Sequence, residues 1–319
     1  MNSSATTPGV QPPGSTPDDE DVIKAIPLRH PVRLLCAILV LAAVAIFLYD
    51  AATNRPAYQW DIVGKYVFDR RISRAAMITL SLTALSMFFA ILLAVALAIM
   101  RLSPNPVLKS VAWGYLWIFR GTPVYVQLVF WGLFPTIYQS IFLGIPLTHI
   151  GFDISPQSAI SLYWWAVIGL ALNEAAYMAE IVRAGLLSVD PGQEEAATAL
   201  GLSWWQTMRR IILPQAMRVI IPPTGNEVIS MLKTTSLVTA VPYSMDLYTR
   251  TRDISGENFA PVSMLIVASI WYVFFTSILM IGQYFLERHY ARGTRHVELG
   301  GVQGEPNPII APNHQGGPA

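Results

Sequence analysis

The sequence predicts an all-α protein, a polytopic membrane bundle of about six transmembrane helices. Its composition is 53% hydrophobic and only 13% charged, whereas a soluble domain carries about 25% charged residues. Long runs lack charge altogether, and residues 75–100 contain none. A helix needs about 20 apolar residues to cross a bilayer. Backbone groups in hydrocarbon must bond internally, and the runs lack a barrel's alternation, so helices are expected.

Six apolar runs are expected to cross the membrane. They are residues 34–49, 75–100, 124–143, 158–182, 216–241 and 261–286. The first is short and precedes the others as an extra N-terminal transmembrane helix. It also resembles the apolar part of a signal peptide, but the 33-residue Pro-rich lead-in is too long for one.

The remaining segments have distinct compositions. Residues 1–33 and 287–319 are polar and rich in Pro or Gly, so they are expected to be disordered cytoplasmic tails. Residues 50–74 mix aromatic and charged side chains and are expected to form an extracytoplasmic interfacial segment. The core of the bundle then occupies 75–286. The segments on the side of the N-terminus and the C-terminus carry more Lys and Arg than those on the other side of the membrane. Because Lys and Arg are in excess on the cytoplasmic side, both termini are expected in the cytoplasm. The Arg residues of 50–74 argue the other way, whereas 144–157 has no Lys or Arg and fits the outside.

A polar segment at 186–214 carries clear helix punctuation. Asp190-Pro191-Gly192-Gln193 is typical of a helix start, with Asp as the N-cap and Gln reaching back. Gly201 is typical of a helix end, and Ser203 to Gln206 forms a second capping box. Pro214 should interrupt the second helix before the next span. The pattern predicts two short helices joined by a tight Gly turn on one membrane face.

The spacing of this segment resembles a known family motif. The residues that carry the resemblance are Glu195, Ala196, Ala197, Gly201, Ile211, Leu213 and Pro214. They resemble the cytoplasmic coupling loop of binding-protein-dependent ABC importer permeases. FRGTP at 119–123, NEAAYMAEIVR at 173–183 and MLKTTSL at 231–237 resemble the polar amino acid branch of that family. The resemblance covers roughly residues 60–290 and implies an ABC type I importer permease-like fold of five core helices, to which 34–49 is added.

The resemblance implies a division of labour between subunits. The chain would be the permease subunit of an ATP-driven polar amino acid importer in the bacterial inner membrane. It would provide the translocation pathway and couple to two separate ABC ATPase subunits, beside a second permease subunit, homologous or identical, and an extracytoplasmic solute-binding protein. ATP and Mg would be bound by the ATPase, and the chain itself would be no enzyme. No P-loop pattern occurs, no metal spacing appears among the His residues, and the net charge of +1 gives no sign of nucleic acid.

Charged side chains inside the apolar runs are candidates for the substrate pathway. They are Glu174, Glu227 and Lys233, with Asn173 and Asn226 as weaker candidates. Intramembrane charge costs on the order of 2.5–3.5 kcal/mol, so such groups face a cavity or a partner. Lys233 could meet a substrate carboxylate, and either Glu an amino group. The alternative is pairing between helices inside the bundle.

The sequence leaves open a structural role for some intramembrane charges and two other functions for the chain. Glu180 and Arg183, three residues apart near the inner surface, are expected to form a structural ion pair. An ion-gradient-driven secondary transporter of amino acids could use Glu174 and Glu227, but no inverted repeat is evident. An intramembrane enzyme would need a reactive constellation that the sequence does not display.

Overall fold

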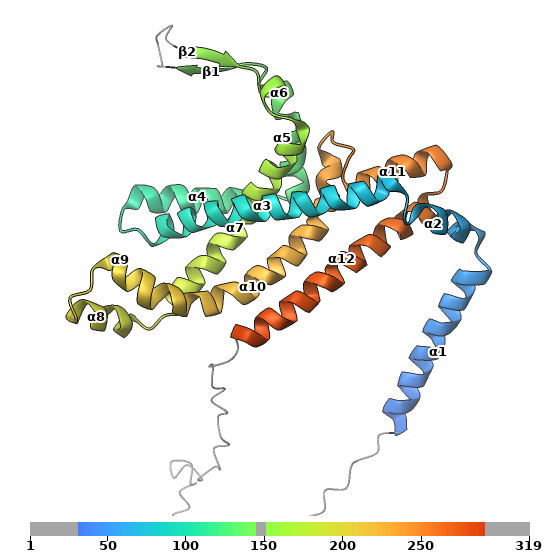
Figure 1. Ribbon diagram of the computed structural model, residues 1–319, viewed down its shortest axis with the longest axis horizontal. Helices are drawn as coiled ribbons and strands as arrows, with labels where there is room; N and C mark the ends of the chain where they lie inside the picture. The colour runs from blue at the N-terminus through green and yellow to red at the C-terminus, as the bar shows by residue number, and fades with distance from the viewer. Residues whose placement is uncertain (1–30, 145–150, 291–319) are drawn as a thin grey trace, which may run out of the picture. The chain divides into compact units, whose positions relative to one another are not determined.

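The computed structural model describes residues 31–144 and 151–290, which are mostly helical (Figure 1). The chain divides into two units between Pro56 and Ala57. The first unit contains one long helix, α1 (Pro31–Thr53). The elements of the second are, after the short turn η2 (Pro56–Tyr58), α2 (Trp60–Tyr66), α3 (Arg70–Leu102), α4 (Pro106–Gly121), α5 (Val124–Ile137), β1 (Ile141–Gly144), β2 (Gly151–Ile154), α6 (Pro156–Ala159), α7 (Leu162–Leu187), α8 (Pro191–Ala199), α9 (Trp204–Thr207), η3 (Met208–Ile212), α10 (Leu213–Thr234), η4 (Thr235–Ala240), α11 (Leu247–Asn258) and α12 (Pro261–Tyr290).

Helix α1 is longer than the apolar run that predicted it. It begins at Pro31 rather than at residue 34, and it extends to Thr53. Its most apolar window has a mean hydropathy of 2.6, and no residue of that window is buried within the chain. Pro31 suits the first turn of a helix, because its missing N–H would be unbonded there in any case. The tail predicted for residues 1–33 otherwise lies outside the described residues, as does the end of the chain after residue 290.

Four helices of the described residues are long and apolar enough to cross a membrane, namely α1, α3, α7 and α12. Two of the six predicted spans do not reach this length or this apolar character. Helix α5 has only 14 residues, and α10 has 22 but includes charged side chains and two internal prolines. All six apolar runs therefore contain a helix, as the fold class requires.

The run 124–143 was predicted as one span, and this is wrong at its C-terminal end. Helix α5 ends at Ile137, and Ile141–Gly144 forms a strand that pairs antiparallel with Gly151–Ile154, with Ile141 opposite Ile154. The polar residues after Ile137 end the apolar helix, and the Ser140 hydroxyl donates to Asp153 Oδ1 at 2.9 Å. A two-stranded hairpin is thereby added to the helical fold.

Helix α7 lies at the centre of the packed bundle. It contacts α3 along its length and also packs against α10, α5 and α4 (Figure 1). Its buried face is rich in alanine, with Ala166, Ala175 and Ala176 fully buried. Small residues let helix backbones approach closely in a membrane bundle. At Gly185 an added Cβ would collide with Ile220 of α10, so α7 and α10 are closest near this residue.

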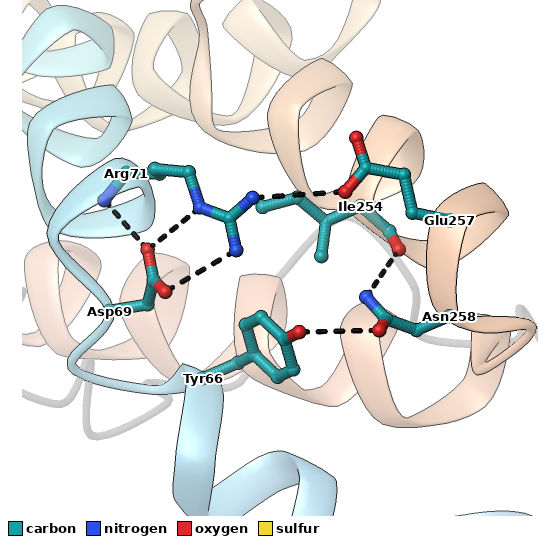
Figure 2. A network of polar contacts seen from close by, with 6 residues as sticks. All are labelled: Tyr66, Asp69, Arg71, Ile254, Glu257 and Asn258. Carbon is teal, nitrogen blue, oxygen red and sulfur yellow. Dashed lines mark hydrogen bonds and ion pairs between the residues drawn. The ribbon is translucent and has the colours of Figure 1, made fainter.

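A polar network joins α2, α3 and α11, and Figure 2 shows it. Asp69 caps α3, accepting from the Arg71 backbone N–H at 2.7 Å. The Arg71 guanidinium also donates to Asp69 and lies 3.7 Å from Glu257. Its hydrogen bond holds the pKa of Asp69 below the usual value. Residues 70–74 of the predicted interfacial segment form the start of α3, because this cap starts the helix there.

Candidate coupling segment and translocation site

The segment between α7 and α10 forms the predicted pair of short helices. Asp190 caps α8, accepting from the Gly192 backbone N–H at 2.7 Å. Gly201 then has φ of 73°, the left-handed conformation that ends a helix. The N–H of Leu202 donates to the Ala197 carbonyl at 3.1 Å, which closes the turn. Ser203 and Gln206 form a reciprocal capping box that starts α9.

Two details of this segment differ from the prediction. Gln193 accepts a hydrogen bond from Gln215 at 3.4 Å, where the sequence suggested that it would reach back to the cap. Pro214 does not interrupt the helix. It follows a π-helical turn, η3, in which the Leu213 N–H donates to the Met208 carbonyl. A π turn widens the backbone and so leaves room for a ring that would clash with the carbonyl four residues earlier.

The tip of the segment is apolar and exposed. Leu200 is 80% exposed, and Trp204 and Trp205 are each more than 60% exposed. The motif residues Glu195, Ala196, Gly201, Leu213 and Pro214 are exposed as well, while Ile211 is half-buried and Ala197 is buried. Exposed large aromatic side chains on a rigid turn are typical of a surface that another protein covers.

Glu174 of α7 and Glu227 of α10 meet inside the bundle. Their carboxyl groups interact directly. Glu174 is only 7% exposed, and its Oε1 has no hydrogen-bond partner. No Lys or Arg of the described residues forms an ion pair with either carboxyl group. Glu227 is half-buried. Two neighbouring carboxyl groups without a basic partner repel each other when both are ionised, so a cation placed between them would be stabilised.

The other candidate residues have different surroundings. Lys233 and Asn226 are exposed on α10, and Lys233 forms no ion pair with either glutamate. They are seven residues apart, with the exposed Ser230 between them, so the three share one helix face. Glu180 and Arg183 form the predicted ion pair at 2.8 Å, and Arg101 of α3 joins it at 3.6 Å.

Asn173 has a structural role, which it shares with Gln127. Its amide donates to the Phe119 carbonyl at 3.2 Å and to Gln127 Oε1 at 3.1 Å. Gln127 in turn donates to the carbonyls of Phe119 and Thr122, each at 3.0 Å. These carbonyls lie at the break between α4 and α5, where Thr122-Pro123 is extended. One signal in the sequence could have identified Gln127, namely an amide in an otherwise apolar run.

Replacement of Gln127 by Met should therefore destabilise the fold. It leaves the Thr122 carbonyl without the Gln127 donor and the Asn173 amide without its Gln127 acceptor, at a cost of roughly 1–3 kcal/mol. We expect a lower melting temperature of the purified protein by several degrees. Gln139→Met, at an exposed position beyond α5, is the control and should melt like the wild type. Equal melting of Gln127→Met and the control would contradict the role given to Gln127.

The helical bundle, the protruding pair of short helices and the carboxyl groups that meet inside the bundle fit the class of membrane permeases. Residues 86–292 match the family described as "Binding-protein-dependent transport system inner membrane component", and the chain belongs to this family. It is therefore a permease subunit of an ABC importer of the amino acid branch, a role that the comparisons support over that of a secondary transporter.

Individual relatives are similar over most of their length. The chain is 56% identical over 285 residues to the arginine transport system permease protein ArgU of Corynebacterium glutamicum, covering 89% of this chain and 88% of that one. It is 36% identical to the nopaline transport system permease protein NocM of Agrobacterium fabrum, covering 66% and 86%. A solved amino acid ABC transporter "with histidines" matches with a TM-score of 0.57 and 31% identity, covering 69% of this chain and 94% of that one.

Proposed function

We propose that the chain is the permease of an importer for arginine or another amino acid with a cationic side chain. The observation that carries this proposal is the pair of the buried Glu174 and the half-buried Glu227, without a basic partner among the described residues. A guanidinium is planar and donates bidentately to carboxylates, and it is less strongly hydrated than an ammonium ion. The similarity to an arginine permease supports the same substrate class.

The translocation pathway in this proposal follows α10. Its exposed polar face, with Asn226, Ser230 and Lys233, has no covering helix in the described part of the chain. A polar face in a membrane helix needs a water-filled cavity or a partner helix. We assign this face to the pathway shared with a second permease subunit. Lys233 would attract the substrate carboxylate, and the two glutamates would hold its cationic end.

Competition between amino acids tests the substrate class. We expect excess unlabelled arginine to abolish uptake of labelled arginine in cells that produce the complete importer. Lysine should compete more weakly, because an ammonium cannot bridge two carboxylates in one plane. Glutamine, which is shorter and uncharged but can still donate hydrogen bonds, is the control and should not compete. Equal competition by glutamine and arginine would contradict a site built for a cation.

Coupling in this proposal occurs through α8 and α9. Their exposed apolar tip would sit in a recess on one of two ATPase subunits, which bind ATP and Mg²⁺, and an extracytoplasmic solute-binding protein would deliver the substrate to the opposite face. The exposed side chains of Leu200, Trp204 and Trp205 support a protein partner at this tip. The proposed orientation places the tip and both chain termini in the cytoplasm.

Cysteine labelling tests the orientation. After Cys36→Ala removes the single cysteine, new cysteines at the exposed positions Ser158 and Ser188 should react from opposite sides of the membrane. We expect an impermeant maleimide added to intact cells to label Ser158→Cys and to reach Ser188→Cys only after the membrane is opened. Labelling of both in intact cells would contradict the proposed topology.

A further inference from the structure

An open pocket between α3, α4 and α7 carries more positive than negative charge. It has a volume of about 340 Å³, and its lining includes Arg101, Arg120 and Glu180. Glu180 is shared by two guanidinium groups, those of Arg183 at 2.8 Å and Arg101 at 3.6 Å. Arg120 lies over the ring of Tyr177 at 5.6 Å and pairs with no carboxylate of the described residues. Two guanidinium groups thus share one carboxylate while a third lines the same pocket, and the local excess of positive charge attracts an anion.

The rim of this pocket is apolar and aromatic. Trp113 and Trp117, one turn apart on α4, are stacked with their ring centroids 6.2 Å apart. Their exposed fractions are 57% and 66%, and the neighbouring Val111 and Ile118 are at least half exposed. A free inorganic anion gains nothing from such a rim. A ligand with an anionic head and a hydrocarbon tail would contact both the arginines and the tryptophans.

The pocket lies at the end of the bundle that carries the coupling segment. Arg101 is in the last turn of α3, and the next residue, Leu102, shares a groove with Asp190 and Trp204 of the coupling segment. Figure 1 shows the C-terminal end of α3 and the start of α4 on the same side as α8 and α9. Helix ends with exposed Trp and Arg are typical of the level of the lipid headgroups.

We propose that this pocket binds the headgroup of an anionic phospholipid. Arg120 and Arg101 would donate to its phosphate oxygens, and Trp113 and Trp117 would pack against the glycerol and the first part of an acyl chain. A zwitterionic lipid also has a phosphate, but its positive amine meets the arginine cluster. Basic pockets between transmembrane helices bind anionic headgroups, and each Lys or Arg near the surface contributes about 1 kcal/mol.

Lipid retention by the full-length protein tests the proposal. The importer would be equilibrated in nanodiscs with equal amounts of phosphatidylglycerol and phosphatidylcholine, extracted into mild detergent, and its retained lipids counted by mass spectrometry. We expect phosphatidylglycerol to be retained preferentially. Arg120→Gln should lower this preference roughly fivefold, and Arg120→Lys should lower it less. Lys109→Gln is the matched control, since Lys109 is exposed on the same helix and does not line the pocket.

Three outcomes would overturn the proposal. The first is equal retention of both lipids by the wild type. The second is an Arg120→Gln variant, with unchanged melting temperature, that retains phosphatidylglycerol as Lys109→Gln does. The third is complete displacement of the lipid by inorganic phosphate or by arginine, which would identify a simple anion site or a part of the substrate pathway. Retained preference in the presence of either competitor supports a lipid site.

Discussion

Gly201→Asp is expected to leave the protein in the membrane at wild-type amounts and to reduce binding-protein-stimulated ATP hydrolysis and amino acid uptake together. Gly201 has φ of 73°, a left-handed conformation that costs most side chains about 1–2 kcal/mol. Nothing lies within 4 Å of an added Cβ, so packing inside the chain is not the obstacle. If docking on the ATPase requires this turn, the added charge faces the partner.

The expected loss for Gly201→Asp is at least about fivefold in both rates, because an unpaired charge buried against the partner costs about 1 kcal/mol or more, whereas Asp tolerates the left-handed conformation as Asn does. Gly201→Asn is the matched control, because Asn has nearly the same size, carries no charge and tolerates the left-handed conformation. It should act close to the wild type. Glu195→Ala should have a milder effect, since it removes one exposed polar side chain and favours the helix. The measurement is ATP hydrolysis and uptake in reconstituted vesicles. Wild-type rates for Gly201→Asp would show that α8 and α9 are not the coupling element.

Glu227→Gln is expected to abolish most uptake while the protein stays folded. The variant keeps the shape of the side chain and removes one of the two charges that would bind the cationic substrate. Removal of one partner of a buried charged contact typically costs 2–5 kcal/mol, so at least about a tenfold loss of uptake follows. The melting temperature should stay unchanged or rise, because the repulsion between the two carboxylates is relieved.

Two variants separate a substrate role from a structural one. Glu174→Gln should resemble Glu227→Gln, since both carboxyl groups are expected to contact the same cation. Glu257→Gln, at an exposed glutamate near Arg71, is the control and should transport normally. Normal arginine uptake by a stable Glu227→Gln importer would remove the pair from the pathway. A large fall in melting temperature would mean that the pair stabilises the bundle instead.

Local rules made much of the coupling segment predictable. The caps at Asp190 and Ser203 and the turn at Gly201 depend on neighbouring residues only, and all three are confirmed. The long apolar runs likewise predicted the helical fold, because their composition can be recognised without knowledge of distant contacts. The predicted helix interruption at Pro214 is wrong, because the sequence does not show that the backbone widens into a π turn just before this residue.

Features that depend on distant contacts could not be predicted. The strand Ile141–Gly144 could not be separated from the helix before it, because its residues belong to the same apolar run in the sequence. A short apolar run does not distinguish a strand from a helix. The pairing of Glu174 with Glu227, and of Arg101 with Glu180, depends on which faces of α7, α10 and α3 meet. The charged residues themselves stood out as intramembrane groups. Gln127 was missed because a single amide in an apolar run has no spacing pattern to mark it.

In the proposed function, this chain forms the translocation pathway, and ATP hydrolysis in another subunit drives transport through it. Uptake of labelled arginine into vesicles that contain the chain, its ATPase and its solute-binding protein tests this most directly. With ion gradients collapsed by ionophores, we expect uptake to require ATP, the ATPase and the binding protein. The chain alone, with a proton or sodium gradient imposed and no ATP, should give none. Gradient-driven uptake by the chain alone would contradict the account.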